Sequence, residues 1–115
     1  MRDLMKTRDV DQNARTTVEC FVHRITKYIG AYAAAMNGLD AVVFTAGIGE
    51  NNQHAREWIL TDTDFLGIIL DKEKNKIKGE TVISAENSRV KVLMIPTNEE
   101  LAIARDTAEI VAEKT

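Results

Sequence analysis

The chain has 115 residues, of which 44% are hydrophobic and 29% charged, proportions that are ordinary for one globular domain. Its 15 basic and 18 acidic residues give a net charge of -3, which argues against a non-specific nucleic-acid surface, because such a surface needs clustered Lys and Arg. One cysteine, Cys20, excludes an internal disulfide, and the N-terminal residues lack an apolar signal core, so we expect a cytoplasmic location. No stretch approaches the roughly 20 apolar residues of a membrane span.

The first element is predicted to be a long helix from about Asp11 to Asn37. Apolar residues recur there at spacings of three and four, which defines one face of a helix. Asp9 or Asp11 is suited to cap its start, and Gly38 is suited to be the left-handed residue after its end. The apolar positions are Ala14, Val18, Phe21, Val22, Ile25, Ile29, Tyr32, Ala33 and Met36.

Two stronger strands are predicted, each followed by a helix. Residues 40–46 form a nearly continuous apolar run, typical of a strand buried on both faces, and a helix is expected over residues 53–60. Residues 90–95 form the second strand, which Pro96 ends. The final helix is then expected to run to about Glu113, with Thr97 and Glu100 as a capping box. Its buried positions are predicted to be Leu101, Ile103, Ala104, Ile110 and Val111.

The middle of the chain is predicted to hold two short strands, at residues 65–70 and 81–84, separated by an exposed charged loop over residues 71–79. The resulting order of helices and strands indicates an α/β fold whose two main strands run parallel. Two main strands make a narrow sheet, so we expect an incomplete domain.

Two strand-to-helix junctions carry the residues with chemical potential. Gly47–Asn51 follows the first main strand, and its two glycines allow a tight turn that brings backbone N–H groups close to a ligand at a helix start. The same glycines also fit an ordinary turn. Glu99 and Glu100 follow the second strand, where a carboxylate is suited either to Mg²⁺ or to the helix dipole. Because parallel strands place both junctions at one edge of the sheet, a nucleotide is able to bridge them.

The remaining reactive side chains are expected to have structural roles. Both histidines are predicted to face solvent, and Trp58 is predicted to join the core. Cys20 is expected to be a helix residue without a chemical role, so no nucleophilic role is assigned to it. The helix arginines are expected to form surface ion pairs rather than phosphate clamps. These histidines and arginines are His23, His54, Arg56 and Arg105.

Several segments resemble one family of kinases. Asp40-Ala-Val-Val-Phe-Thr-Ala-Gly-Ile-Gly-Glu-Asn51 resembles the adenosine-binding segment of acetate kinases, and Ile95-Pro-Thr-Asn-Glu-Glu-Leu-Ala-Ile-Ala-Arg-Asp-Thr107 resembles their C-terminal signature. Residues 28–36 and 65–71 are similar to the same family. The resemblance covers nearly the whole chain, in the family's order.

The resemblance implies a fold and an activity. The family has ribonuclease-H-like domains, shared with sugar kinases, heat-shock cognate chaperones and actin, and binds ATP between them. Residues 1–115 are then expected to be the C-terminal nucleotide-binding part of such a domain. The implied reaction is reversible phosphoryl transfer from ATP to acetate, which gives acetyl phosphate and ADP. The resemblance also implies Mg²⁺ as cofactor and a homo-oligomer.

The resemblance also implies which residues bind the nucleotide. Glu99 matches the Mg²⁺-associated acid, and Arg2 matches an arginine near the nucleotide, in a segment whose middle residue is the first residue of this chain. The family's catalytic aspartate, transition-state histidine and acetate-binding arginines match nothing here, so no catalytic residue is expected and the isolated chain is expected to be inactive. The residues expected against the adenosine are Gly47, Ile48, Gly49, Glu50 and Asn51.

Three alternatives stay open at this stage. The acyl pocket is not part of the matched sequence, so a propionate kinase fits as well as an acetate kinase. The same two junctions also suit a free-standing nucleotide-binding module without chemistry. A structural or oligomerisation module, packing through its long first helix, is the third alternative.

Overall fold

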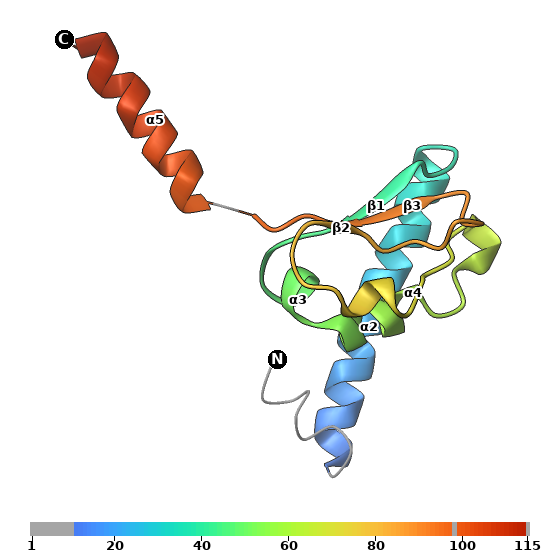
Figure 1. Cartoon of the computed structure of the whole chain (residues 1–115). Helices are drawn as coiled ribbons and strands as arrows, with labels where there is room; N and C mark the ends of the chain where they lie inside the picture. Colours follow the sequence, from blue (N-terminus) through green and yellow to red (C-terminus); the bar gives the residue numbers. More distant parts are fainter. Residues whose placement is uncertain (1–10, 98, 115) are drawn as a thin grey trace.

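The structure is a computed structural model that describes residues 11–97 and 99–114, so Arg2 lies outside the described residues. It contains a long helix, a small sheet, two short helices that follow the first strand of the sheet, and a final helix that stands apart (Figure 1). The elements are α2 (Gln12–Ala35), β1 (Ala41–Phe44), α3 (Ala46–Asn51), α4 (Gln53–Leu60), the 3-10 turns η1 (Asp64–Leu66) and η2 (Lys74–Lys76), β2 (Thr81–Val82), β3 (Lys91–Met94) and α5 (Glu99–Lys114).

The long first helix is confirmed, with a small change at its end. Asp11 is its N-cap, and the side chain accepts hydrogen bonds from first-turn N–H groups at 2.9 and 3.4 Å. After the helix, Asn37 rather than Gly38 takes the left-handed conformation, with φ of 59°. Gly38 then donates to the carbonyl of Ala33 at 2.8 Å, which completes a Schellman-type cap. Asparagine tolerates this conformation better than most side chains. Gly38 follows with φ of 129°, a conformation that favours glycine.

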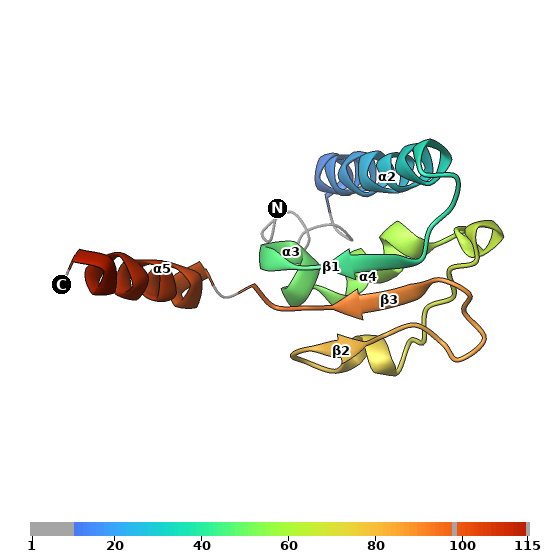
Figure 2. The ribbon, with the colours of Figure 1, turned by 90° about the horizontal axis from the view of Figure 1, so that it is seen from above.

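The sheet has three strands in the order β1-β3-β2 (Figure 2). β1 and β3 are parallel, with Phe44 opposite Met94, so the prediction of two parallel main strands is confirmed. β2 runs antiparallel to β3. Since β1 and β3 end at the same register position, the two strand-to-helix junctions leave the same edge of the sheet.

The predicted strand at residues 65–70 is wrong. Its start is the 3-10 turn η1, and Gly67 then takes a φ of 90°, which interrupts an extended chain. Leu70 alone forms a β-bridge, to Ser84. The prediction at residues 81–84 is confirmed only for β2 and for that bridge.

The core lies on one face of the sheet. Val92 and Met94 of β3 and Ile83 are almost fully buried, and half-buried side chains of α2 pack against them. The prediction that the first strand is buried on both faces is wrong, because Val43 of β1 is 49% exposed. Alternation along a strand sends Val43 to the face opposite Phe44, and that face is uncovered in the described part of the chain.

α5 extends away from the rest of the molecule in both views (Figures 1 and 2). The prediction that its apolar face is buried is therefore wrong: the side chains of Leu101, Ile103, Ala104, Ile110 and Val111 are all exposed. The periodicity of the helix is amphipathic, but amphipathicity shows only that a face suits burial and not that a partner surface is within reach.

Candidate functional site

The two strand-to-helix junctions are in contact. The carboxylate of Glu50, in α3, accepts a hydrogen bond at 3.0 Å from the backbone N–H of Thr97, which lies between β3 and α5. These residues are 47 positions apart in sequence. The contact brings the Gly47–Asn51 segment and the start of α5 to one place, as the parallel strands require.

The Gly47–Asn51 segment is a strained helical turn rather than an open loop. It forms α3 together with Ala46, and Ala46 has φ of 56° while Gly47 has φ of 28° and ψ of -111°. Gly47 therefore adopts a conformation that side chains oppose. Gly49 is different, because its φ is not positive and the atoms nearest to an added Cβ belong to Phe44, at an ordinary 3.5 Å. Only the first glycine is required by backbone conformation.

The helix that follows begins as the sequence predicts. Asn52 is the N-cap of α4, and its side chain accepts a hydrogen bond from the N–H of Ala55 at 3.0 Å. Ala55 and Ile59 are buried, whereas Trp58 is only half-buried and its ring stacks on His54 at a centroid distance of 6.0 Å. The predicted core position of Trp58 is thus only partly correct.

Two cavities flank the Gly47–Asn51 segment and divide its residues. The larger, of about 540 Å³, is polar and lies between Glu50, Asn51, the segment Lys76–Gly79 and Pro96. The smaller, of about 300 Å³, is apolar and lies between α2, β1 and α4, with Ile48 and Gly49 on its wall. Both volumes suit a small ligand. The five predicted residues therefore do not all face one cavity.

Arg56 is the residue of this region that the sequence analysis misjudged. It was expected to form a surface ion pair, but it is only 3% exposed and lines both cavities. Its guanidinium donates to the side-chain oxygen of Asn75 at 2.7 Å, to the backbone carbonyl of Asn75 at 2.7 Å and to the carbonyl of Gly49 at 3.1 Å. All three acceptors are neutral.

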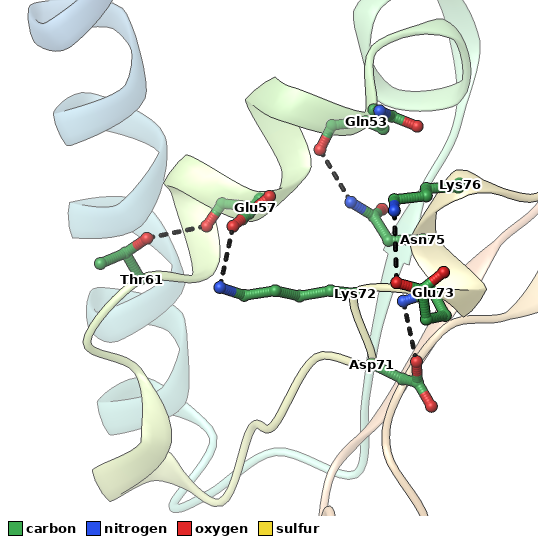
Figure 3. Close-up of polar contacts among 8 residues, drawn as sticks. All are labelled: Gln53, Glu57, Thr61, Asp71, Lys72, Glu73, Asn75 and Lys76. Carbon is green, nitrogen blue, oxygen red and sulfur yellow. Dashed lines mark hydrogen bonds and ion pairs between the residues drawn. The ribbon is translucent and has the colours of Figure 1, made fainter.

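Asn75 corrects a second prediction, that residues 71–79 form an exposed loop. Most of that segment is exposed, but Asn75 is only 2% exposed, and its amide donates to the carbonyl of Gln53 at 2.8 Å (Figure 3). An ion pair between Lys72 and Glu57, at 3.3 Å, joins the same two elements. The segment is therefore fastened onto α4 and forms one wall of the larger cavity. This role could not be predicted from the sequence, because a segment with so many charged residues is typical of an exposed loop.

The candidate metal ligand is only partly placed. Glu99 is the first residue of α5, but its side chain lies outside the described part of the structure, while Glu100 is exposed. The capping box of Thr97 and Glu100 adjoins Asn98, which is also outside the described residues, so it stays a prediction. Within residues 11–97 and the described part of α5, no group of three or more His, Cys, Asp or Glu side chains is arranged to hold a metal ion.

Other sequence predictions concern residues outside these cavities or at their rims. His23, His54 and Cys20 are exposed, and the exposure of the two histidines was predicted. Arg105 is exposed on α5. None of the described helices is both long and apolar enough to cross a membrane.

The chain was compared with known proteins. The sequence model of the acetokinase family matches residues 1–105. The chain belongs to the acetokinase family. An acetate kinase of Clostridioides difficile is 59% identical over 102 residues, which are 88% of this chain and 26% of the relative. A crystal structure of Porphyromonas gingivalis acetate kinase matches 96% of this chain and 28% of its own, with a TM-score of 0.85 and 42% identity.

A propionate kinase is also similar. The crystal structure from Francisella tularensis matches 90% of this chain and 27% of its own, with a TM-score of 0.78 and 39% identity. The chain thus spans about a quarter of the length of the acetate and propionate kinases it matches. The helix and small mixed sheet are an α/β part of the acetate kinase fold, and the predicted family resemblance is confirmed.

Proposed function

We propose that residues 1–115 are the C-terminal nucleotide-binding part of an acetate kinase. The complete enzyme would transfer a phosphoryl group reversibly from ATP to acetate and give acetyl phosphate and ADP. Membership of the acetokinase family supports the reaction class. The similarity to a propionate kinase keeps propionate as the alternative acyl substrate.

The nucleotide site is proposed at the contact between the two junctions. The hydrogen bond from the Thr97 N–H to the Glu50 carboxylate carries this proposal, because it brings a glycine-bearing turn and an acidic helix start together at the carboxyl edge of parallel strands. Ligands of open α/β sheets bind at such edges. The adenosine would lie against Gly47–Asn51, with Ile48 and Gly49 offering an apolar wall to the base. Arg2 is proposed to approach the nucleotide as well.

Glu99 is proposed as the acid associated with Mg²⁺. Oxygen ligands from one or two carboxylates, with the remaining positions filled by water and phosphate, are the usual environment of this ion. When bound, Mg²⁺ would offset the negative charge of the phosphates during transfer. The position of Glu99, immediately after the segment that contacts Glu50, supports the assignment.

The chain alone is proposed to be catalytically silent, cytoplasmic and self-associating. Phosphoryl transfer depends on positioning both reactants, and no residue of this chain is assigned to the acyl acceptor. Exposed apolar side chains on the sheet and on α5 support self-association.

The test is a calorimetric titration of the chain with ADP, with and without Mg²⁺, beside a coupled kinase assay. We expect saturable ADP binding that Mg²⁺ strengthens, and no turnover in the usual enzyme range of roughly 1–10³ s⁻¹. A free-standing nucleotide module would also bind ADP, but it would not restore kinase activity when fused to the preceding part of an acetate kinase. Absence of ADP binding in both the chain and that fusion would favour the structural module and overturn the proposal.

A further inference from the structure

Arg56 is a buried cation at the centre of the region proposed to bind the nucleotide. It lies within α4 and is 3% exposed, although arginine is rarely buried this fully. Burial lowers the pKa of its guanidinium from the usual value, because desolvation disfavours the charged form. Arginine nevertheless stays protonated in neutral water, so a full positive charge is held inside the protein.

The guanidinium is fixed by a closed set of hydrogen bonds. Its Nε and Nη2 both donate to Asn75, at 2.7 Å each, and the planar fork sets their direction. The Asn75 amide in turn donates to Gln53 at the start of α4 (Figure 3). α4 and η2 thus hold the guanidinium in one orientation before any ligand is present.

The remaining bond reaches the glycine segment. Nη1 donates to the carbonyl of Gly49 at 3.1 Å. α3 has few other anchors: it buries no residue, and Thr45 gives it no side-chain cap. The hydrogen bond between Glu50 and Thr97 attaches α3 to the second junction, and the hydrogen bond from Arg56 to Gly49 attaches α3 to α4.

A buried charge is a costly way to hold two elements together. Desolvating an ion is unfavourable, and replacement of buried ions by apolar residues is often neutral or stabilising. Here the acceptors are two backbone carbonyls and one side-chain amide oxygen, and these neutral groups stabilise a buried cation less than a carboxylate would. The feature that an apolar side chain cannot reproduce is the directional hold on the Gly49 carbonyl.

We propose that Arg56 is a positioning residue for the nucleotide segment. By fixing the Gly49 carbonyl, it sets the orientation of the peptide groups of Gly47–Asn51 that face the ligand, and its effect on nucleotide binding is exerted through these groups. This inference rests on the proposed nucleotide site. Asn75 is the residue that orients Arg56, so the chain segment around η2 takes part in nucleotide binding without being in the two junctions.

The test compares Arg56→Lys with Thr63→Val. Lysine keeps the charge but loses the planar fork. Thr63 is a matched control, because it is 2% exposed and donates to the Leu60 carbonyl at 2.6 Å, beyond the far end of α4. Two quantities are measured for each protein: amide hydrogen exchange of residues 48–52 without nucleotide, normalised to the core amides of Ile83 and Val92, and the ADP dissociation constant by calorimetry.

For Arg56→Lys we expect normalised exchange of residues 48–52 to rise about tenfold or more, and ADP binding to weaken by a similar factor. Thr63→Val should change both the normalised exchange and the ADP dissociation constant by less than about twofold, because the hydrogen bond that it removes affects only the global stability of the chain. Equal changes in the two variants would overturn the proposal. Weaker ADP binding with unchanged exchange would also overturn it, because Arg56 would then act on the ligand directly.

Two further outcomes are separable. If the wild-type chain binds no ADP while Arg56→Lys still frees residues 48–52, the proposed nucleotide site fails and the positioning of the segment stands. If Arg56→Lys does not fold, Asn75→Ala replaces it and should raise exchange of residues 48–52 by a smaller factor. Unchanged exchange in Asn75→Ala would contradict the proposal.

Discussion

The Glu50 carboxylate and the Thr97 N–H, 3.0 Å apart, are the point where the two halves of the candidate site touch. Glu50 belongs to the turn after β1, and Thr97 follows β3. The hydrogen bond between them therefore shows that the two junctions stay side by side beyond the ends of the parallel strands.

Glu50→Ala should release Thr97. A hydrogen bond of this kind contributes about 0.5–1.5 kcal/mol when it is exposed, so exchange of the Thr97 amide should quicken roughly 2- to 12-fold. Hydrogen exchange followed by NMR measures this. Glu50→Gln is the control, since it retains an acceptor oxygen and should lie close to wild type; an unchanged Thr97 amide in Glu50→Ala would contradict the contact.

Gly47→Ala should destabilise the chain more than Gly49→Ala. Gly47 has φ of 28° in open space, so the cost is conformational and of about 1–3 kcal/mol. Gly49 lacks a positive φ, and alanine there should be neutral or stabilising by up to about 1 kcal/mol. Urea denaturation of both variants gives the comparison, and similar losses in the two would show that the strain at Gly47 is not real.

Gly49→Val should abolish ADP binding while the chain remains folded. The branched side chain would project at the wall of the apolar cavity, where the base is proposed to lie, and would crowd Phe44. Calorimetric titration with ADP measures the loss, and circular dichroism controls for folding. Normal ADP binding by Gly49→Val would place the nucleotide elsewhere.

Glu99→Ala should weaken binding of Mg-ADP and leave binding of metal-free ADP nearly unchanged. The carboxylate is proposed to act through the ion, so its removal matters only when the ion is present. Titrations with and without Mg²⁺ separate the two effects. Glu100→Ala is the neighbouring control, with an expected cost of roughly 0.5–2 kcal/mol in helix stability alone. An identical response of both variants would argue against Glu99 as a metal-associated residue.

The chain should self-associate at tens of micromolar, an order of magnitude typical of weak interfaces. Val43 and Val82 lie on the uncovered face of the sheet and are 49% and 46% exposed, and β1 is an edge strand among the described elements. Sedimentation velocity should show a dimer or larger species. Val43→Lys should shift it towards monomer, whereas Thr17→Lys, on exposed α2 surface, should not. A wild-type monomer at that concentration would contradict this prediction.

The sequence alone determined the elements with strong local signals. The helices α2 and α4 and the parallel pairing of the two apolar strands were predicted, because helical periodicity and short apolar runs are properties of neighbouring residues. The sequence left the N-cap of α2 open between Asp9 and Asp11, and the structure shows Asp11 in that role. The family could also be predicted, since two long family motifs occur in the sequence in the family's order. The position of the candidate site at the carboxyl edge of the strands follows from the parallel pairing.

Only the tertiary structure decided which polar side chains are buried and which predicted apolar faces stay exposed. Arg56 and Asn75 are polar residues with charged neighbours in the sequence, a pattern typical of exposed positions. They become a buried, hydrogen-bonded pair only because η2 packs against α4. The exposure of Val43 and of α5 is equally non-local, because an apolar face is buried only where another element covers it. The local sequence pattern therefore predicts the type and approximate bounds of most helices and of the main strands. Burial depends on residues far apart in sequence, and so does the anchoring of the Gly47–Asn51 segment.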